Sequence, residues 1–280
     1  MTIAAGFLCS DGVLVCADTE VTGGLGKYHV AKVRHRKEEG VCEYLLSGAG
    51  NTGYVGMAFD VIGQAIYNSR ADLLAAKDSD DRSNIFHTKM RGVARRLFKH
   101  IRDVYPYDTD KPTLDLILGV RFLFGDGSPQ LMHIGQDGSV EWAQEIVCGT
   151  GDIVVRSYLS ILHTKIMPME LMRPLAMFVI YQAKKVGFSV GGSTHVYTLP
   201  SGGVYRLVDE EGLARLTERA MHLCMVDARD PSFSKHVIET MAETLKNDIV
   251  QLRGALEGDE ESLKRAREMM AAAREQSKQS

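Results

Sequence analysis

Thr2 is the first residue of this sequence that could do chemistry, because a free α-amine can activate a hydroxyl on the same residue. A hydroxyl is a poor nucleophile until a base removes its proton, and an N-terminal amine can act as that base. Removal of Met1 would give Thr2 such an amine. Small residues are common at position 2, so Thr2 alone does not decide the question. The residues after it form an apolar run, a tight turn, a second apolar run and then Asp18.

Short strands are predicted along much of the chain. Residues 3–9 and 13–18 are apolar runs separated by Ser10-Asp11-Gly12. Because Asp-Gly tolerates the positive φ angles of tight turns, the two runs predict a hairpin. Further strands are expected at 29–36, 41–47, 114–124, 130–134, 139–143, 193–199 and 203–208. The small residues at 47–50 predict a turn into a helix, with Asn51 or Thr52 as its cap.

Two pairs of helices separate these groups of strands. The first pair has apolar stripes with helical spacing, namely Val55, Ala58, Phe59, Ile62 and Ile66, then Phe86, Met90, Val93, Leu97, Ile101 and Val104. Pro106 ends the second stripe. The second pair is expected at about 152–163 and 174–186. This order predicts the α+β class, as a four-layer αββα sandwich, with an ordinary two-layer α+β domain as the alternative.

The composition changes after Val208. Residues 209–280 are rich in Glu, Lys, Arg, Ala and Met and contain almost no β-branched runs. We therefore expect a core of residues 1–208 and a helical C-terminal extension of residues 209–280. The extension could be a structural flap or an assembly surface. A separate basic face is interpreted as the solvent-exposed side of its helix; its residues are Lys89, Arg91, Arg95, Arg96 and Lys99.

The bulk composition excludes several classes. A net charge of −3 argues against a general nucleic-acid binder. No apolar run approaches the roughly 18 residues of a membrane span, so no membrane partner is expected. The cysteines Cys9, Cys16, Cys42, Cys148 and Cys224 are scattered and show no metal-site spacing. They indicate buried thiols in a reducing compartment, and we expect a cytoplasmic protein.

The chain resembles a proteasome β-type subunit of the N-terminal-nucleophile (Ntn) threonine peptidases. That family opens its mature chain with Thr and has an Asp sixteen residues later, as Asp18 follows Thr2. Other matching segments are Val30-Ala31-Lys32-Val33, Ser47-Gly48-Ala49-Gly50, Gly149-Thr150-Gly151 and Gly191-Gly192. The resemblance covers residues 2–208 and implies an Ntn-hydrolase sandwich.

The resemblance implies a catalytic set around Thr2. Thr2 would supply both the nucleophile and the base. Lys32 would lie beside it and lower the pKa of its amine and hydroxyl, and Asp18 would hold Lys32 in place. Taken without the resemblance, Lys32 is a solvated strand lysine and Asp18 a strand-end acid.

Two further residues complete the implied site. The backbone N–H of Gly48 would stabilise the oxyanion, a contact typically worth about 3 kcal/mol of barrier. Thr150 stands where the family has a Ser that hydrogen-bonds near the amine. The alternatives are a helix-entry turn at Gly48 and a helix cap at Thr150. The residues expected to line the substrate pocket are apolar: Val21, Val30 and Leu46.

The sequence also departs from the family pattern. The family has an Asp and a Ser just before the late Gly-Gly, whereas this chain has Gly187 and Val190. Ser189 or Thr150 would have to replace them. The familiar Arg near the first Asp is Glu20. These changes leave the nucleophile, the acid and the lysine in place and weaken the groups that support them.

The resemblance implies a threonine-type endopeptidase subunit of a self-compartmentalised ring. Removal of Met1 would expose its N-terminal Thr nucleophile. Its partners would be copies of itself, a polypeptide substrate and an ATPase unfoldase, with no cofactor and no metal. Two alternatives remain open: a catalytically weak or inactive proteasome-like scaffold, and an Ntn amidohydrolase acting on a small amide. The sequence fixes neither the ring size nor the physiological substrate.

Overall fold

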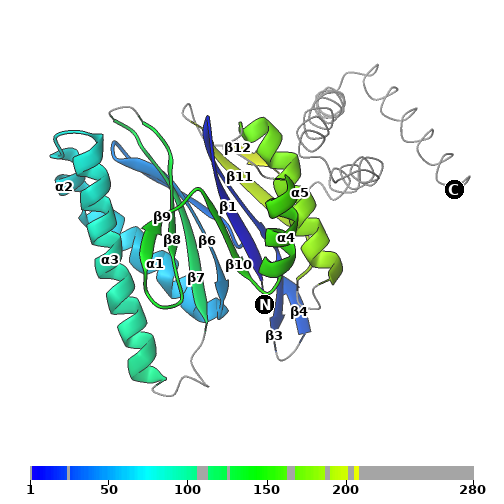
Figure 1. The fold of residues 1–280 in the computed structure, drawn as a ribbon. Helices are drawn as coiled ribbons and strands as arrows, with labels where there is room; N and C mark the ends of the chain where they lie inside the picture. Colours follow the sequence, from blue (N-terminus) through cyan, green and yellow to red (C-terminus); the bar gives the residue numbers. More distant parts are fainter. Residues whose placement is uncertain are drawn as a thin grey trace, which may run out of the picture. The chain divides into compact units, whose positions relative to one another are not determined.

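In the part of the chain that the structure describes, two antiparallel five-stranded sheets lie at the centre of this computed structural model (Figure 1). The strand order of the first sheet is β10 (Glu145–Gly149), β1 (Ile3–Cys9), β2 (Gly12–Asp18), β11 (Thr194–Pro200) and β12 (Tyr205–Leu207). That of the second is β5 (Arg34–Glu38), β6 (Cys42–Gly50), β7 (Leu114–Phe122), β8 (Gln130–Ile134) and β9 (Val140–Trp142). A separate hairpin pairs β3 (Glu20–Gly23) with β4 (Gly26–His29).

The described residues are 2–23, 26–105, 113–124, 127–162, 168–186, 190–200 and 205–207. Every helix and strand named here belongs to one unit, Met1–Arg215. The extension expected at 209–280 lies outside the described residues, so both it and the boundary at 208 stay predictions. No described helix combines the length and the apolar character needed to span a bilayer.

Helices cover the outer faces of both sheets (Figure 1). The second sheet carries α1 (Thr52–Asn68), α2 (Arg70–Leu74) and α3 (Ser79–Val104), and α1 packs on β6 and β7. The first sheet carries α4 (Asp152–Leu162) and α5 (Met169–Val186), and α5 packs on β1, β2 and β11. The predicted four-layer αββα sandwich is therefore confirmed.

The core between the two sheets follows the period-two alternation of the strands. Val13, Val15 and Ala17 of β2 are fully buried against the second sheet, where they join Leu45 and Ile117. Two glycines let the sheets approach closely. A Cβ at Gly6 would lie 2.7 Å from Ile117 Cγ2, and one at Gly119 would lie 2.8 Å from Val13 Cγ1.

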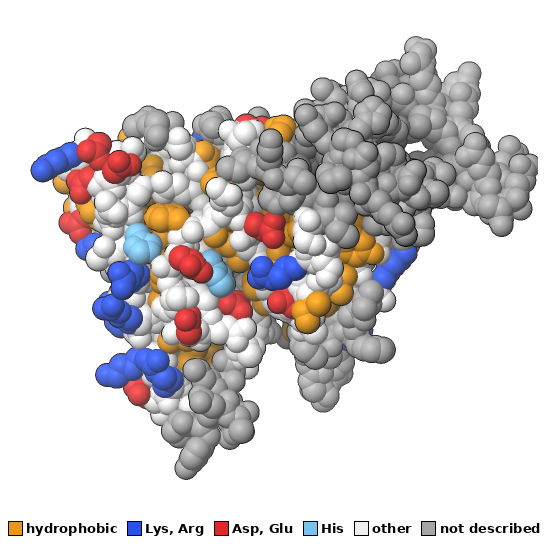
Figure 2. Space-filling view, in the orientation of Figure 1, with side chains coloured by type: hydrophobic (Ala, Val, Ile, Leu, Met, Phe, Trp, Pro, Cys, Tyr) orange, Lys and Arg blue, Asp and Glu red, His pale blue; other side chains and the backbone are white. Residues whose placement is uncertain are grey.

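The predicted helical stripes face another hydrophobic core, which lies between the second sheet and the helices α1 and α3. The buried members are Ala58, Phe59, Ile62 and Ile66 of α1, and Phe86, Met90, Val93, Leu97 and Ile101 of α3. Asn51 caps α1, because its side chain accepts the backbone N–H groups of Gly53 and Tyr54. Val104, the last member of the second stripe, is exposed. The five residues of the predicted basic face of α3 are half-buried or exposed, whereas Arg82 of the same helix is buried. Figure 2 shows Lys and Arg side chains gathered on the side of the molecule where α3 lies.

Two local predictions are wrong. The strand expected at 29–36 is interrupted, because β4 ends at His29 and β5 begins at Arg34. Ser47 Oγ donates a hydrogen bond of 3.0 Å to the Lys32 carbonyl and so ties the irregular segment to β6. The turn expected at 47–50 is instead the end of β6, which stays paired with β7 as far as Gly50. The sequence pattern also gives no indication of β3, β10 or α2.

The close packing of the sheets predicts a specific loss of stability. Gly119→Ala should lower the free energy of unfolding by about 1–3 kcal/mol, because the stiff Val13 side chain cannot yield to a new methyl group. Gly92→Ala in α3 is the matched control. Its Cβ would lie 3.8 Å from the nearest atom, Arg96 Nη1. This change should raise stability by up to about 1 kcal/mol. Urea unfolding measures both, and a fully stable Gly119→Ala protein would contradict the packing described.

Candidate active site

Thr2 lies directly before β1 and is held through its backbone. Its carbonyl accepts a hydrogen bond of 3.0 Å from the Thr150 N–H. Gly149 has φ of +106°, and a Cβ there would lie only 1.9 Å from the Thr2 carbonyl oxygen. The turn at Gly149–Thr150 therefore requires glycine and fixes the Thr2 backbone. Thr150 makes this contact with its backbone N–H, whereas its side chain was expected to hydrogen-bond near the amine.

Asp18, at the end of β2, is fully buried and receives three hydrogen bonds. Its Oδ1 atom accepts the Ile3 N–H at 3.0 Å and the Lys32 Nζ at 2.7 Å, and its Oδ2 atom accepts the Gly191 N–H at 3.2 Å. Two of these donors share one oxygen. The Lys32 ammonium is therefore no farther than two hydrogen-bond lengths from the backbone nitrogen of the residue after Thr2.

Lys32 lies in the irregular segment between β4 and β5 and is 7% exposed. Its ammonium also donates to the Glu20 backbone carbonyl. Burial lowers the pKa of Lys32, and the Asp18 carboxylate opposes that shift. Burial in turn raises the pKa of Asp18, against the opposing effect of Lys32. Lysine is the cationic side chain whose pKa shifts most readily on burial, and catalytic lysines use this property.

Gly48 presents its backbone to the same region. The pairing between β5 and β6 ends at Arg34 and Leu46, so Gly48 lies beyond it and pairs with Leu116 of β7 on its other side. Packing also requires a small residue here, because a Cβ would lie 2.7 Å from the Asp115 carbonyl oxygen. Packing therefore requires glycine at position 48, independently of the expected role of its N–H as an oxyanion donor.

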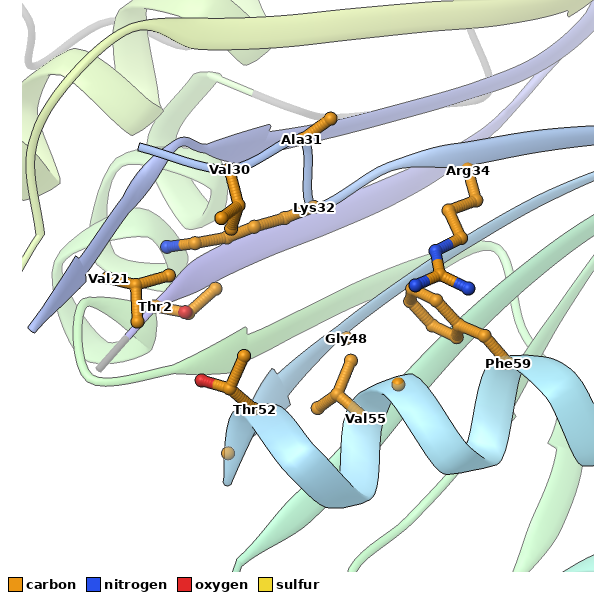
Figure 3. A pocket seen from close by; sticks show the side chains of 12 residues that line it. Thr2, Val21, Val30, Ala31, Lys32, Arg34, Gly48, Thr52, Val55 and Phe59 are labelled. Carbon is orange, nitrogen blue, oxygen red and sulfur yellow. The ribbon is translucent and has the colours of Figure 1, made fainter. Parts of the chain in front are cut away.

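These residues border one cleft, shown in Figure 3. Its lining residues are Thr2, Val21, Val30, Ala31, Lys32, Arg34, Gly48, Gly50, Thr52, Val55, Gly56 and Phe59. Asp18 reaches it only through Lys32. Val21 and Val30 line the cleft as expected. Leu46 does not, and this prediction is corrected: Leu46 is 1% exposed and is buried in the core beneath α1.

Several lining residues were missed in the sequence. Thr52, Val55 and Phe59 come from the first turns of α1, which lies along the cleft. Arg34 begins β5. The helical stripe predicts that Val55 and Phe59 face inward, but nothing in the pattern separates a side chain at the cleft from one in the core.

The Gly191–Gly192 segment contacts Asp18 through the Gly191 N–H. Gly192 has φ of +66°, and a Cβ there would lie 2.4 Å from His29 Nδ1. Lys184 Nζ of α5 donates to the Gly192 carbonyl at 2.6 Å, which anchors the segment to a helix. Val190 is buried, and Gly187 and Ser189 lie outside the described residues.

The His, Cys, Asp and Glu residues that the structure describes are groups from which a metal site or a reactive thiol could be built. No three His, Cys, Asp or Glu side chains among the described residues are grouped to hold a metal ion. Cys9, Cys16, Cys42 and Cys148 are free and buried, and burial raises the pKa of Cys9, Cys16 and Cys42 to about 12. Cys224 is outside the described part of the chain.

Solved structures that are similar to this chain include Anbu proteins. The helical assembly of the Anbu complex from Pseudomonas aeruginosa has a TM-score of 0.62 and 17% identity, covering 79% of this chain and 93% of that chain. Anbu (ancestral beta-subunit) from Yersinia bercovieri has a TM-score of 0.61 and 15% identity, covering 80% and 95%. Anbu from Hyphomicrobium sp. strain MC1 has a TM-score of 0.60 and 17% identity, covering 82% and 100%.

The fold is that of the Anbu proteins. Identities this low establish the fold and nothing finer. No protein-family model and no curated protein matches the chain in sequence. The assignment to the proteasome β-type subunits is therefore corrected. The structural relatives are proteasome-like in fold but form a distinct family.

The buried ion pair gives a prediction about stability. Asp18→Asn should lower the free energy of unfolding by about 3–5 kcal/mol, because it leaves the buried Lys32 ammonium without its counter-charge. Asp60→Asn is the matched control, since it breaks an ion pair with Arg34 in which Asp60 is 77% exposed. That change should alter stability by less than about 1 kcal/mol. Equal effects in denaturant titrations would show that the Asp18 pair does not organise the site.

Proposed function

We propose that this protein is an N-terminal-nucleophile hydrolase that cleaves peptide bonds with Thr2, once Met1 has been removed. The observation that carries the proposal is the shared cleft: Thr2, Lys32 and Gly48 all line it. The Asp18 carboxylate supports the arrangement because it binds both Lys32 and the N–H of Ile3. A cytoplasmic location is part of the proposal.

The proposed reaction passes through an ester on Thr2. The α-amine of Thr2 takes the proton from Oγ as Oγ attacks the peptide carbonyl carbon. The Gly48 N–H donates to the resulting oxyanion, and the Lys32 charge favours the ionised hydroxyl. The α-ammonium then gives its proton to the departing amine, and the C–N bond breaks. Water, with the α-amine as base, then attacks the ester carbonyl carbon. The bond from that carbon to Oγ breaks, the carboxylic acid product leaves, and the α-ammonium returns its proton to Oγ.

Self-association is the second part of the proposal. The Pseudomonas aeruginosa relative is described as a helical assembly of the Anbu complex. Its fold is shared by this chain, so we propose that copies of this chain assemble as well. The expectation of a closed ring and the helical arrangement of the relative differ only in whether the repeat closes on itself.

One observation favours a scaffold without activity. Val190 is a buried apolar residue where the peptidase pattern has a hydroxyl side chain. A site without that support would hold its amine less firmly. The activity test below distinguishes the peptidase from an inactive scaffold and from a hydrolase of small amides.

Thr2→Ala should abolish peptide cleavage, by about 10³-fold or more, because the attacking oxygen is gone. Thr2→Ser keeps the oxygen and should retain most activity. Release of fluorophore from a peptide panel, with small amides alongside, measures both. Intact mass should show that Met1 is absent. Retained Met1, or a Thr2→Ala protein as active as the wild type, would refute the nucleophile; cleavage of small amides alone would redirect the substrate.

Electron microscopy of the purified protein tests assembly. We expect closed rings or helical filaments, and we expect the same particles for Thr2→Ala because that change removes one oxygen and one methyl group inside the cleft. A protein that stays monomeric at micromolar concentration would contradict self-association. This measurement does not depend on activity, so it separates a scaffold from an isolated enzyme.

A further inference from the structure

The cleft beside Thr2 combines apolar walls with a second cation. Its apolar lining consists of Val21, Val30, Ala31, Val55 and Phe59. Arg34 lines the same cleft together with Lys32. No lining residue in the described part of the chain carries a carboxylate. The cleft is therefore suited to a ligand group that has an apolar stem and a negative end.

Arg34 is held by an aromatic ring. Its guanidinium carbon lies 5.0 Å from the centroid of the Phe59 ring. Figure 3 shows the guanidinium over this ring, beside the α1 helix that forms one side of the cleft. Stacking of this kind orients the planar group so that its N–H edge can meet a carboxylate.

The charge of Arg34 is only weakly satisfied by the protein. Its partner is Asp60, with Arg34 Nη1 3.3 Å from Asp60 Oδ1. The two side chains are 42% and 77% exposed, and exposed pairs of this type contribute little. The Lys32 charge, in contrast, is offset by the fully buried Asp18. Arg34 is therefore the cation that remains available to a ligand.

We propose that the cleft selects an acidic side chain, glutamate or aspartate, on the acyl side of the bond that is cut. This inference rests on the proposed function. The methylene groups of the acidic residue would pack on Val30 and Val55, and its carboxylate would pair with the fork of N–H groups on Arg34. Phe59 would hold the guanidinium in place for this pair, because the ring lies 5.0 Å from the guanidinium carbon.

Binding is measured apart from cleavage. Fluorescein-labelled pentapeptides that differ only at the central residue, Glu, Gln, Leu or Lys, are titrated into the Thr2→Ala protein, and fluorescence polarisation gives each affinity. The Glu peptide should bind about 10-fold tighter than the Gln peptide, a gain typical of one charge-assisted pair. In the same background, Arg34→Met should remove this difference and Arg34→Lys should keep part of it.

Two neighbours provide controls. Arg36→Met removes the same charge from β5 at a residue that does not line the cleft, so it should preserve the preference for Glu. Asp60→Asn removes the competing carboxylate and should tighten binding of the Glu peptide several-fold. Equal affinity for the Glu and Gln peptides, or loss of the preference in Arg36→Met as large as in Arg34→Met, overturns the proposal.

Cleavage by the wild-type protein separates the two hypotheses. If the Glu peptide binds tightly but is never cut, the proposed function fails and the acidic specificity stands. If peptides are cut by Thr2 with no preference for Glu over Gln, the specificity fails and the hydrolase stands. Failure of the Glu peptide to bind at all overturns the specificity, whatever the activity.

Discussion

The buried pairing of Asp18 with Lys32 is the interaction on which the rest of this site depends. An isolated charge in a protein interior is strongly destabilising, so both groups must be correctly placed in the folded state. The same carboxylate also accepts the backbone N–H groups of Ile3 and Gly191. The beginning of β1, the segment before β5 and the segment before β11 are thus fixed to one point.

The two sheets supply the frame for that point. Thr2 directly precedes a strand of the first sheet, whereas Gly48 is near the end of a strand of the second. The sheets meet closely at Gly6 and Gly119, where a side chain would collide with Ile117 or Val13. The α1 helix then closes the cleft from the side of the second sheet. The site is therefore built where the layers meet.

Period and spacing predicted most of the fold. The alternation in β1 and β2 and the apolar stripes of α1 and α3 are local patterns, and the structure contains them within a few residues. The interruption before β5 could not be predicted, because Lys32 leaves the strand pattern only to reach Asp18, a long-range electrostatic contact. The burial of Leu46 has a similar reason. It lies on the same side of β6 as Gly48 but is packed in the core with Phe59 of α1, and the alternation within one strand does not show which of the two residues a helix will bury.

The way Thr2 is anchored has a practical consequence for anyone who handles this protein. The Thr2 carbonyl accepts a hydrogen bond from Thr150, and the Ile3 N–H donates one to Asp18. The backbone on the C-terminal side of Thr2 is therefore fixed, and any residues added before Thr2 continue from its nitrogen. Thr2 is 8% exposed and borders the cleft, so an affinity tag fused ahead of it would start inside that space. Such a fusion would occupy the cleft before any other peptide could enter.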